Sequence, residues 1–244
     1  MSKLADKIRS ATRSQPQQVG FGAARPSGAA TLVLAGIARD AREAADLIGK
    51  GADVALIGSF DSPAAKNGAG DAKNAVLGAR IAGKAADEAQ VYREAGYDFV
   101  VFDPDRASAS TLLDEKVGYV MLLPAGLSDL EIRAIDLFRL DAIDVGDLSG
   151  ALTVRRQIDL QRVTAVTRKP LMAGVPKDIA PAELRALRDS GVAVVAVAAA
   201  GVEQLRKTID ALPPRPNRRD DRDRPSAIVS HHVAAHEDED DDDD

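Results

Sequence analysis

Short apolar segments recur along the chain at nearly regular intervals. Their starting positions lie 20 to 28 residues apart, at Thr31, Asp53, Val76, Phe99, Tyr119, Ala142, Pro170 and Val192. Most of these segments are continuously apolar rather than alternating, which is typical of parallel strands buried on both faces. The intervals leave room for one helix after each strand, so the pattern predicts eight strand–helix units.

The segments between these runs carry helical periodicity and helix-end signals. Ser128 is followed three residues later by Glu131, which is a capping-box pattern at a helix start. Pro181 stands at the expected first position of another helix, and Gly191 stands at its expected end. In the last such segment the apolar residues fall on one helical stripe, formed by Val202, Leu205, Ile209 and Leu212.

Eight such units predict an α/β fold, a single (β/α)8 TIM-type barrel over residues 31–212. The main alternative is a doubly wound open sheet. The segment QVGFGA (18–23) is a ninth candidate strand, which we interpret as a lead-in that closes the bottom of the barrel. A different count makes 18–23 the first strand and places VLGARI (76–81) in a helix.

The first 30 residues are expected to form an N-terminal helix followed by this lead-in. Leu4 and Ile8 lie at helical spacing, which predicts a short amphipathic helix packed on the body of the protein. The segment lacks the apolar region of a signal peptide. The longest apolar run, 192–200, is far shorter than the ~18 residues of a membrane helix. We therefore expect a soluble, cytoplasmic protein with no membrane partner.

The amino-acid composition limits the kinds of catalysis that the protein can carry out. The 244 residues are 45% hydrophobic but only 3% aromatic, so the core must consist mainly of aliphatic side chains. The chain contains no cysteine, which excludes disulfides and thiolate catalysis. No lysine lies inside a predicted strand, which disfavours Schiff-base chemistry. All three histidines lie near the C-terminus, where we interpret them as incidental rather than as a metal site: His231, His232 and His236.

The net charge of −6 is concentrated at one end of the chain. From Pro213 onward there are five arginines and eleven acidic residues, so residues 1–212 hold 32 − 5 = 27 basic and 38 − 11 = 27 acidic side chains. A neutral body argues against a nucleic-acid partner. The tail, 213–244, ends in eight consecutive acidic residues from Glu237, is expected to be disordered, and is suited to contacts with basic partners.

Catalytic groups of such barrels lie at the carboxyl ends of the strands. Asp103 ends the fourth predicted strand, Asp144 lies in the sixth and is followed by Asp147, and Arg80 lies near the end of the third. In one interpretation Asp103 and Asp144 form a carboxylate pair that binds Mg²⁺ or acts as general acid and base. In the plainer one these aspartates cap loops or form ion pairs, with Arg80 paired to Asp103.

The last two units, 169–212, resemble the C-terminal quarter of phosphate-binding barrels, which include thiamine-phosphate synthase and the ribulose-phosphate-binding group. In that family, turns after the seventh strand and before the eighth helix hold a phosphate with backbone N–H groups. The resemblance implies that Ala173 and Gly174 stand at the first turn, and Ala200 and Gly201 at the second. Lys177, which follows the seventh predicted strand, is a further candidate for binding the ligand.

Two further features bear on this resemblance. Glu203 places a carboxylate in the first turn of the last helix, where it would repel a phosphate. The segments LTVRRQIDLQRV (152–163) and TRKPL (167–171) also resemble bacterial barrel proteins of unassigned activity. A likeness at the level of fold does not by itself assign a reaction.

Three functional hypotheses follow from the sequence. The first is a lyase, isomerase or synthase that acts on a small phosphorylated metabolite at the C-terminal face of the barrel. The second is a non-catalytic barrel that serves as a scaffold or interaction protein through its acidic tail. The third is an oxidoreductase that binds FMN through the same phosphate site.

Overall fold

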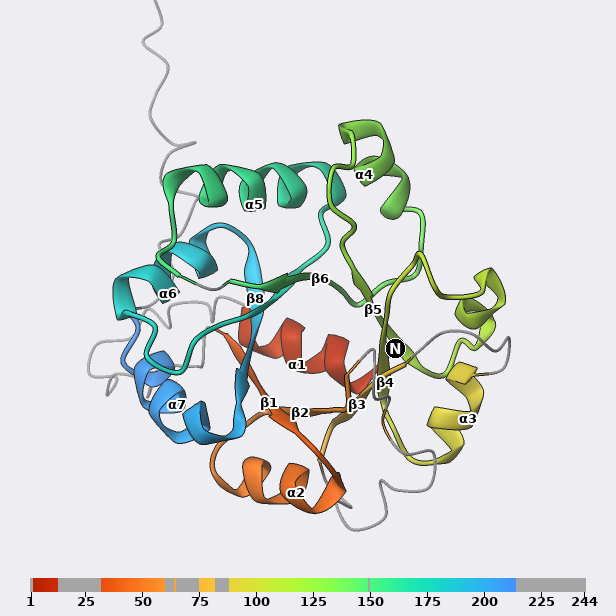
Figure 1. The fold of residues 1–244 in the computed structure, drawn as a ribbon, viewed down its shortest axis with the longest axis horizontal. Helices are drawn as coiled ribbons and strands as arrows, with labels where there is room; N and C mark the ends of the chain where they lie inside the picture. The colour runs from red at the N-terminus through yellow and green to blue at the C-terminus, as the bar shows by residue number, and fades with distance from the viewer. Residues whose placement is uncertain are drawn as a thin grey trace, which may run out of the picture.

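Eight parallel strands form a closed barrel in the order of the sequence, with β8 pairing to β1 (Figure 1). The computed structural model describes residues 2–12, 32–59, 64, 75–81, 88–148 and 150–213. The strands are β1 (Val33–Ala38), β2 (Val54–Ile57), β3 (Leu77–Arg80), β4 (Phe99–Phe102), β5 (Gly118–Leu122), β6 (Ala142–Asp147), β7 (Leu171–Gly174) and β8 (Val192–Ala198). The (β/α)8 prediction is confirmed, and the open sheet is excluded. The count that placed 76–81 in a helix is wrong, because these residues contain β3.

Helices surround the barrel and connect its strands. They are α2 (Ala41–Gly49), α3 (Glu88–Glu94), α4 (Asp129–Ile135), α5 (Val154–Thr167), α6 (Pro181–Asp189) and α7 (Val202–Asp210), together with the 3-10 turns η1 (Ala109–Leu113) and η2 (Ala199–Gly201). The predicted capping box begins α4: the Glu131 carboxylate accepts a 2.7 Å hydrogen bond from the Ser128 N–H, and the Ser128 hydroxyl accepts from the Glu131 N–H. Pro181 occupies the first turn of α6, as predicted.

Two apolar layers account for the burial of the strands on both faces. Val54 and Leu56 of β2 belong to a cluster that fills the barrel, whereas Ala55 and Ile57 belong to a second cluster that includes side chains of the surrounding helices. This alternation follows from the two-residue period of a strand. No helix within the described ranges is long and apolar enough to cross a membrane.

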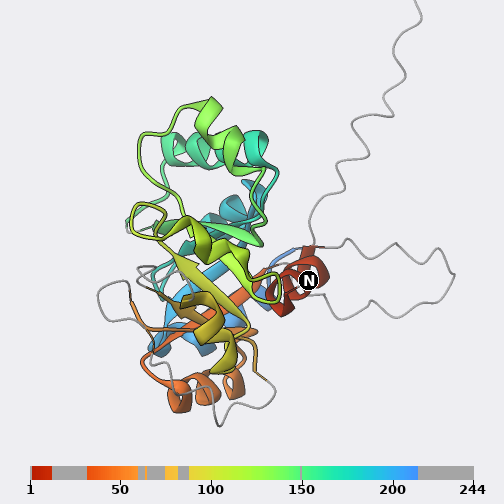
Figure 2. The same ribbon diagram turned by 90° about the vertical axis from the view of Figure 1, so that its right-hand side faces the viewer.

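The N-terminal helix α1 (Lys3–Thr12) closes one end of the barrel (Figure 2). Leu4 and Ile8 are buried and belong to the cluster that fills the barrel, which confirms the amphipathic helix. The Ser2 hydroxyl donates to Asp141, and the Lys3 ammonium lies 2.8 Å from the Asp98 carboxylate. The segment 18–23 and the tail beyond Pro213 lie outside the described residues.

An aspartate directly precedes each of three even-numbered strands. Asp53, before β2, accepts a 2.8 Å hydrogen bond from the Leu34 N–H, and Asp98, before β4, accepts a 3.0 Å bond from the Leu77 N–H. Asp141, before β6, takes the same position, and burial raises the pKa of its carboxyl group. Each aspartate therefore ties the start of its own strand to the preceding strand.

Gly78 is expected to tolerate no larger residue, because a Cβ atom there would overlap the ring of Phe99 inside the barrel. Gly78→Ala should lower the free energy of unfolding by about 1–3 kcal/mol, the usual cost of overpacking. Gly49→Ala in α2 is the matched control, because nothing lies within 4 Å of its Cβ position. That change should be neutral or stabilising by up to about 1 kcal/mol. Equal urea midpoints for the two variants would contradict this.

Candidate functional site

A bulge in β6 shapes the mouth of the barrel, which is the end formed by the carboxyl termini of the strands. Asp144 pairs with Met172 of β7, but Asp147 pairs with Gly174, so three steps along β6 match two along β7. The extra residue is accommodated by Gly146, whose φ of +76° suits glycine. Because Met172 and Gly174 share one face of β7, both carboxylates of β6 lie on the inward face.

Asp144 is the buried member of this pair. Its side chain is held by a 2.9 Å hydrogen bond from the Gly146 N–H, and the residue is only 3% exposed. Burial raises the pKa of the Asp144 carboxyl group, and the negative charge of Asp147 raises it further. The cationic Arg80 on β3 acts in the opposite direction. A raised pKa makes a carboxyl group a better candidate for accepting and donating a proton than an ordinary aspartate.

The Asp103 side chain makes contacts within its own loop. Its carboxylate accepts a 3.0 Å hydrogen bond from the Asp105 N–H and lies 3.3 Å from the Arg106 guanidinium. This is the loop-capping arrangement of the plainer interpretation. After burial and the hydrogen bond from the Gly146 N–H, the charges that act on the pKa of Asp144 are those of Arg80, which lowers it, and Asp147, which raises it; Asp103 is not among them.

A second corner of the mouth combines a cation with a helix start. A Cβ atom on Gly201 would come within 2.7 Å of the Lys177 Cβ, so glycine allows the β7–α6 loop to pack against η2. Lys177 and Ala200 are exposed there. Helix α7 begins without a side-chain N-cap, which leaves its first N–H groups available to an anion.

Gly174 does not share this environment. The position that its Cβ would occupy is taken by the Asp147 carboxylate, which would repel an anion. Glu203 is exposed in the first turn of α7, and its charge reaches Lys50, whose pKa is raised chiefly by Asp46 and in smaller part by Glu203. The Asp147 carboxylate therefore argues against the phosphate contact predicted for Gly174. Lys177, Ala200 and Gly201 remain candidates for binding a phosphate.

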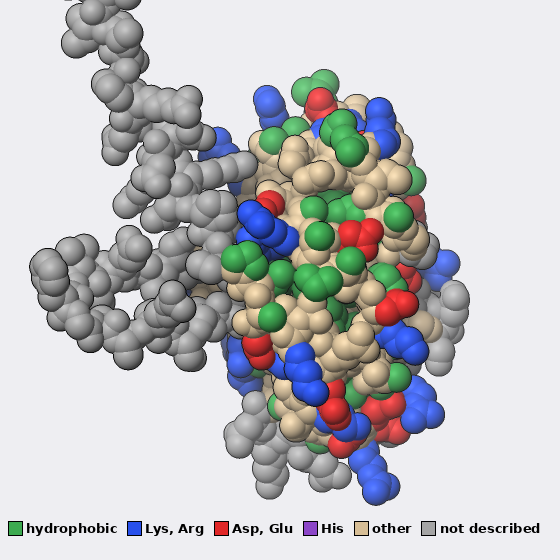
Figure 3. Space-filling model, turned by 90° about the vertical axis from the view of Figure 1, so that its left-hand side faces the viewer, with side chains coloured by type: hydrophobic (Ala, Val, Ile, Leu, Met, Phe, Trp, Pro, Cys, Tyr) green, Lys and Arg blue, Asp and Glu red, His purple; other side chains and the backbone are tan. Residues whose placement is uncertain are grey.

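A cavity of about 300 Å³ lies between the β6–α5 and β7–α6 loops. Its lining includes Asp147 at one side and Pro176, the neighbour of Lys177, at the other, with Leu148, Leu152 and Ile179 between them. This volume suits a small metabolite. On the side of the barrel covered by α5, α6 and α7, basic and acidic side chains are interspersed (Figure 3).

The metal prediction was restricted to Mg²⁺ at strand-end carboxylates. Within the described part of the chain, no three metal-binding side chains gather at one point. Asp144 and Asp147 supply two carboxylates, which is the number of protein ligands that Mg²⁺ often takes when substrate phosphates complete its shell. The Mg²⁺ site predicted at Asp103 and Asp144 stays a prediction.

Comparison with solved structures identifies other barrels. A tryptophan synthase from M. tuberculosis matches with a TM-score of 0.54 and 11% identity over 74% of this chain and 91% of that chain. KGPDC from Streptococcus mutans matches with a TM-score of 0.56 and 9% identity over 75% and 99%. A dihydropteroate synthase from Stenotrophomonas maltophilia matches with a TM-score of 0.53 and 14% identity over 75% and 94%.

No protein-family model and no protein of curated function matches the sequence. At 9 to 14% identity the structural matches establish the fold and leave the reaction open. They agree with the barrel fold that the resemblance of residues 169–212 implies. Sequence reasoning missed the pairing of Asp144 with Asp147. The signal that could have found it is the glycine between them in DVGD (144–147).

Proposed function

We propose that the protein is a lyase, isomerase or synthase that acts on a small phosphorylated metabolite at the mouth of the barrel. The observation that carries this proposal is the β6 bulge. It places the buried Asp144 beside Asp147 on the inward face, within the field of Arg80. A buried carboxyl group with a raised pKa at the carboxyl end of a barrel strand is characteristic of active sites.

Each part of the mouth has a distinct chemical task in this proposal. Asp144 transfers a proton to or from the carbon skeleton of the substrate, and Arg80 stabilises negative charge that develops there. Lys177 and the backbone around Gly201 bind the phosphate, and the 300 Å³ cavity beside Asp147 holds the remainder of the molecule. Asp103, which caps its own loop, is assigned no task in this proposal, and its catalytic role stays a prediction.

Ligand titration with a matched pair of variants tests the proposal. Inorganic phosphate and a panel of small phosphorylated metabolites would be added while amide resonances are followed. We expect shifts at Lys177, Gly201 and Gly146. Lys177→Gln should weaken binding about tenfold, since it removes a charged hydrogen-bond donor. Lys116→Gln removes an exposed lysine just before β5, at the opposite end of the barrel, and should leave the affinity unchanged.

Two results would contradict the proposal. In one, no phosphorylated compound shifts the resonances of the mouth. In the other, Lys177→Gln and Lys116→Gln have the same effect on affinity, which would indicate a general response to surface charge rather than a phosphate site.

A further inference from the structure

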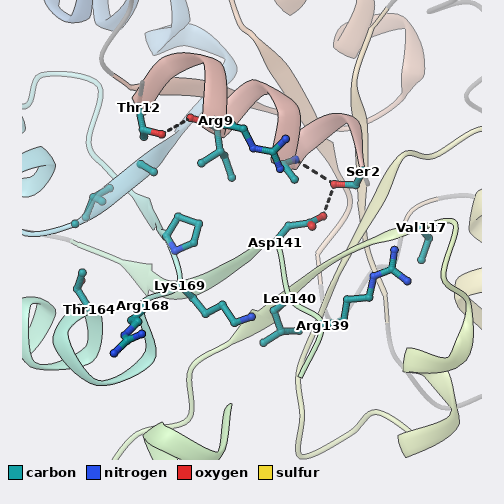
Figure 4. Close-up of a pocket in the computed structure, with 16 residues that line it drawn as sticks. Ser2, Arg9, Thr12, Val117, Arg139, Leu140, Asp141, Thr164, Arg168 and Lys169 are labelled. Carbon is teal, nitrogen blue, oxygen red and sulfur yellow. Dashed lines mark hydrogen bonds between the residues drawn. The ribbon is translucent and has the colours of Figure 1, made fainter. Parts of the chain in front are cut away.

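A second cavity, of about 550 Å³, lies at the end of the barrel opposite to the mouth (Figure 4). It is bounded by α1, the segment before β6, the end of α5 and the start of β8. Asp141 is the one acidic residue of its lining, and the cationic residues of its lining are Arg9, Arg139, Arg168 and Lys169.

At Arg168 and Lys169 the positive charge of this cavity has no carboxylate partner among the described residues. Asp141 is engaged by the Ser2 hydroxyl. Within the described ranges, no carboxylate pairs with Arg168, and Lys169 donates a 3.0 Å hydrogen bond to the Phe138 carbonyl. Arg9 and Arg139 lie 3.5 Å and 3.7 Å from the carboxylates of Asp6 and Glu115, so the excess positive charge of the lining comes from Arg168 and Lys169. The cavity therefore favours an anionic occupant.

We propose that the acidic run at the end of this chain, residues 237–244, docks in this cavity, which we call the basic cavity. The run holds eight consecutive acidic residues. The rest of the tail has more arginines than acidic residues, and residues 1–212 carry equal numbers of basic and acidic side chains. Residues 13–31, which join α1 to the barrel, contain Arg13 and Arg25 and no acidic residue, so they cannot neutralise it. The charge of the run is thus complementary to that of the basic cavity.

The point at which the tail leaves the barrel favours the same contact. The Arg188 guanidinium, which is almost fully buried, donates a hydrogen bond to the Pro213 carbonyl. Arg188 stands three residues before Gly191, which lines the basic cavity. The tail therefore departs from the end of the barrel that holds the cavity.

The length of the intervening chain also suffices. Glu237 is 24 residues beyond Pro213, and 24 residues can span up to about 80 Å when fully extended. A linker of this kind holds its end at an effective concentration of the order of millimolar. Because the contact is electrostatic and solvent-exposed, it should weaken strongly with salt.

A spin label near the run tests this contact in the full-length protein. The chain has no cysteine, so Ala235→Cys provides a single attachment site for a nitroxide. At low ionic strength we expect selective broadening of the amide resonances of Arg139, Arg168 and Gly191, while those of Gly146 and Gly201 at the mouth stay sharp. At about 1 M salt, where the screening length is about 3 Å, the broadening should disappear.

Charge-removing variants provide the matched comparison. Arg168 has a φ of +56°, and asparagine tolerates this conformation, so Arg168→Asn together with Lys169→Gln should remove most of the broadening without disturbing α5. Arg133→Gln on the exposed side of α4 is the control and should leave the broadening intact. Equal broadening in both variants would overturn the proposal.

Three other outcomes would also overturn it. Broadening confined to residues 215–224 would mean that the run pairs with the tail's own arginines. Broadening of isotope-labelled, unmodified protein by added spin-labelled protein would identify a second copy as the binding partner. Broadening that persists unchanged at high salt would exclude the electrostatic origin argued above.

Discussion

Replacing Asp144 by asparagine is expected to make the protein more stable at neutral pH and much less active. Burial raises the pKa of this carboxyl group in the folded state above its value in the unfolded chain, which is near 4. Above that pH the folded state binds more protons than the unfolded state, so stability falls as the pH rises through the folded pKa. Asparagine removes this penalty and still accepts the hydrogen bond from the Gly146 N–H.

We expect Asp144→Asn to raise the free energy of unfolding by about 0.5–2 kcal/mol at neutral pH, the range typical of relieved functional strain. The gain should vanish as the pH falls below about 4, where the wild-type Asp144 carboxyl is protonated in both the folded and the unfolded protein. Urea unfolding at several pH values measures this. Turnover of the phosphorylated substrate should fall by about 10²–10⁴-fold, as for loss of a general acid or base.

Asp105→Asn is the matched control, because this side chain is exposed on the loop after β4. It should change neither the pH dependence of stability nor turnover. A variant Asp144→Asn that is less stable than wild type at neutral pH would show that attraction to Arg80 outweighs the cost of burial. Asp144 would then be a structural ion-pair residue.

The strands were predictable because burial on both faces demands continuous apolar segments, and each of the eight runs overlaps an observed strand, with bounds that differ by at most one residue where the strand extends beyond the run. The α4 capping box was predictable for a different reason: Ser128 and Glu131 satisfy the helix start by contacts within four residues. Both signals are local in the sequence. They need no knowledge of which strand lies beside which.

The candidate site was only partly predictable, because its contacts are not local. Asp144 and Arg80 come from β6 and β3, and only closure of the barrel brings their charges within range of each other. The shift that turns Asp147 inward depends on the register of β6 against β7. Asp103 satisfies its carboxylate with its own loop instead, a local alternative that competes with long-range pairing.

A regular spacing of aspartates in the sequence also indicates how the strands are aligned. Asp53, Asp98 and Asp141 each stand immediately before an apolar run, in every second unit of the first six. The structure shows why the position recurs: a carboxylate there accepts an N–H group at the start of the preceding strand. Because parallel strands start at one edge of the sheet, such an aspartate marks the register between two strands.

Leu4→Ala is expected to destabilise the protein by about 2–5 kcal/mol, the usual cost of truncating a buried leucine. Leu4 is 0% exposed and belongs to the cluster that fills the barrel, so its removal leaves a void where α1 closes the bottom. Lys7→Ala on the exposed face of α1 is the control and should change stability by less than about 0.5 kcal/mol. Urea unfolding of both variants measures the difference.

This comparison separates two roles of α1. If α1 rested on the barrel only through the Ser2–Asp141 and Lys3–Asp98 contacts, Leu4→Ala would cost little, because neither contact involves its side chain. A large cost would show instead that the interior of the barrel extends into α1 and that the helix is part of the core. Because the mouth lies at the other end, Leu4→Ala should leave ligand affinity at Lys177 unchanged under conditions where the variant stays folded.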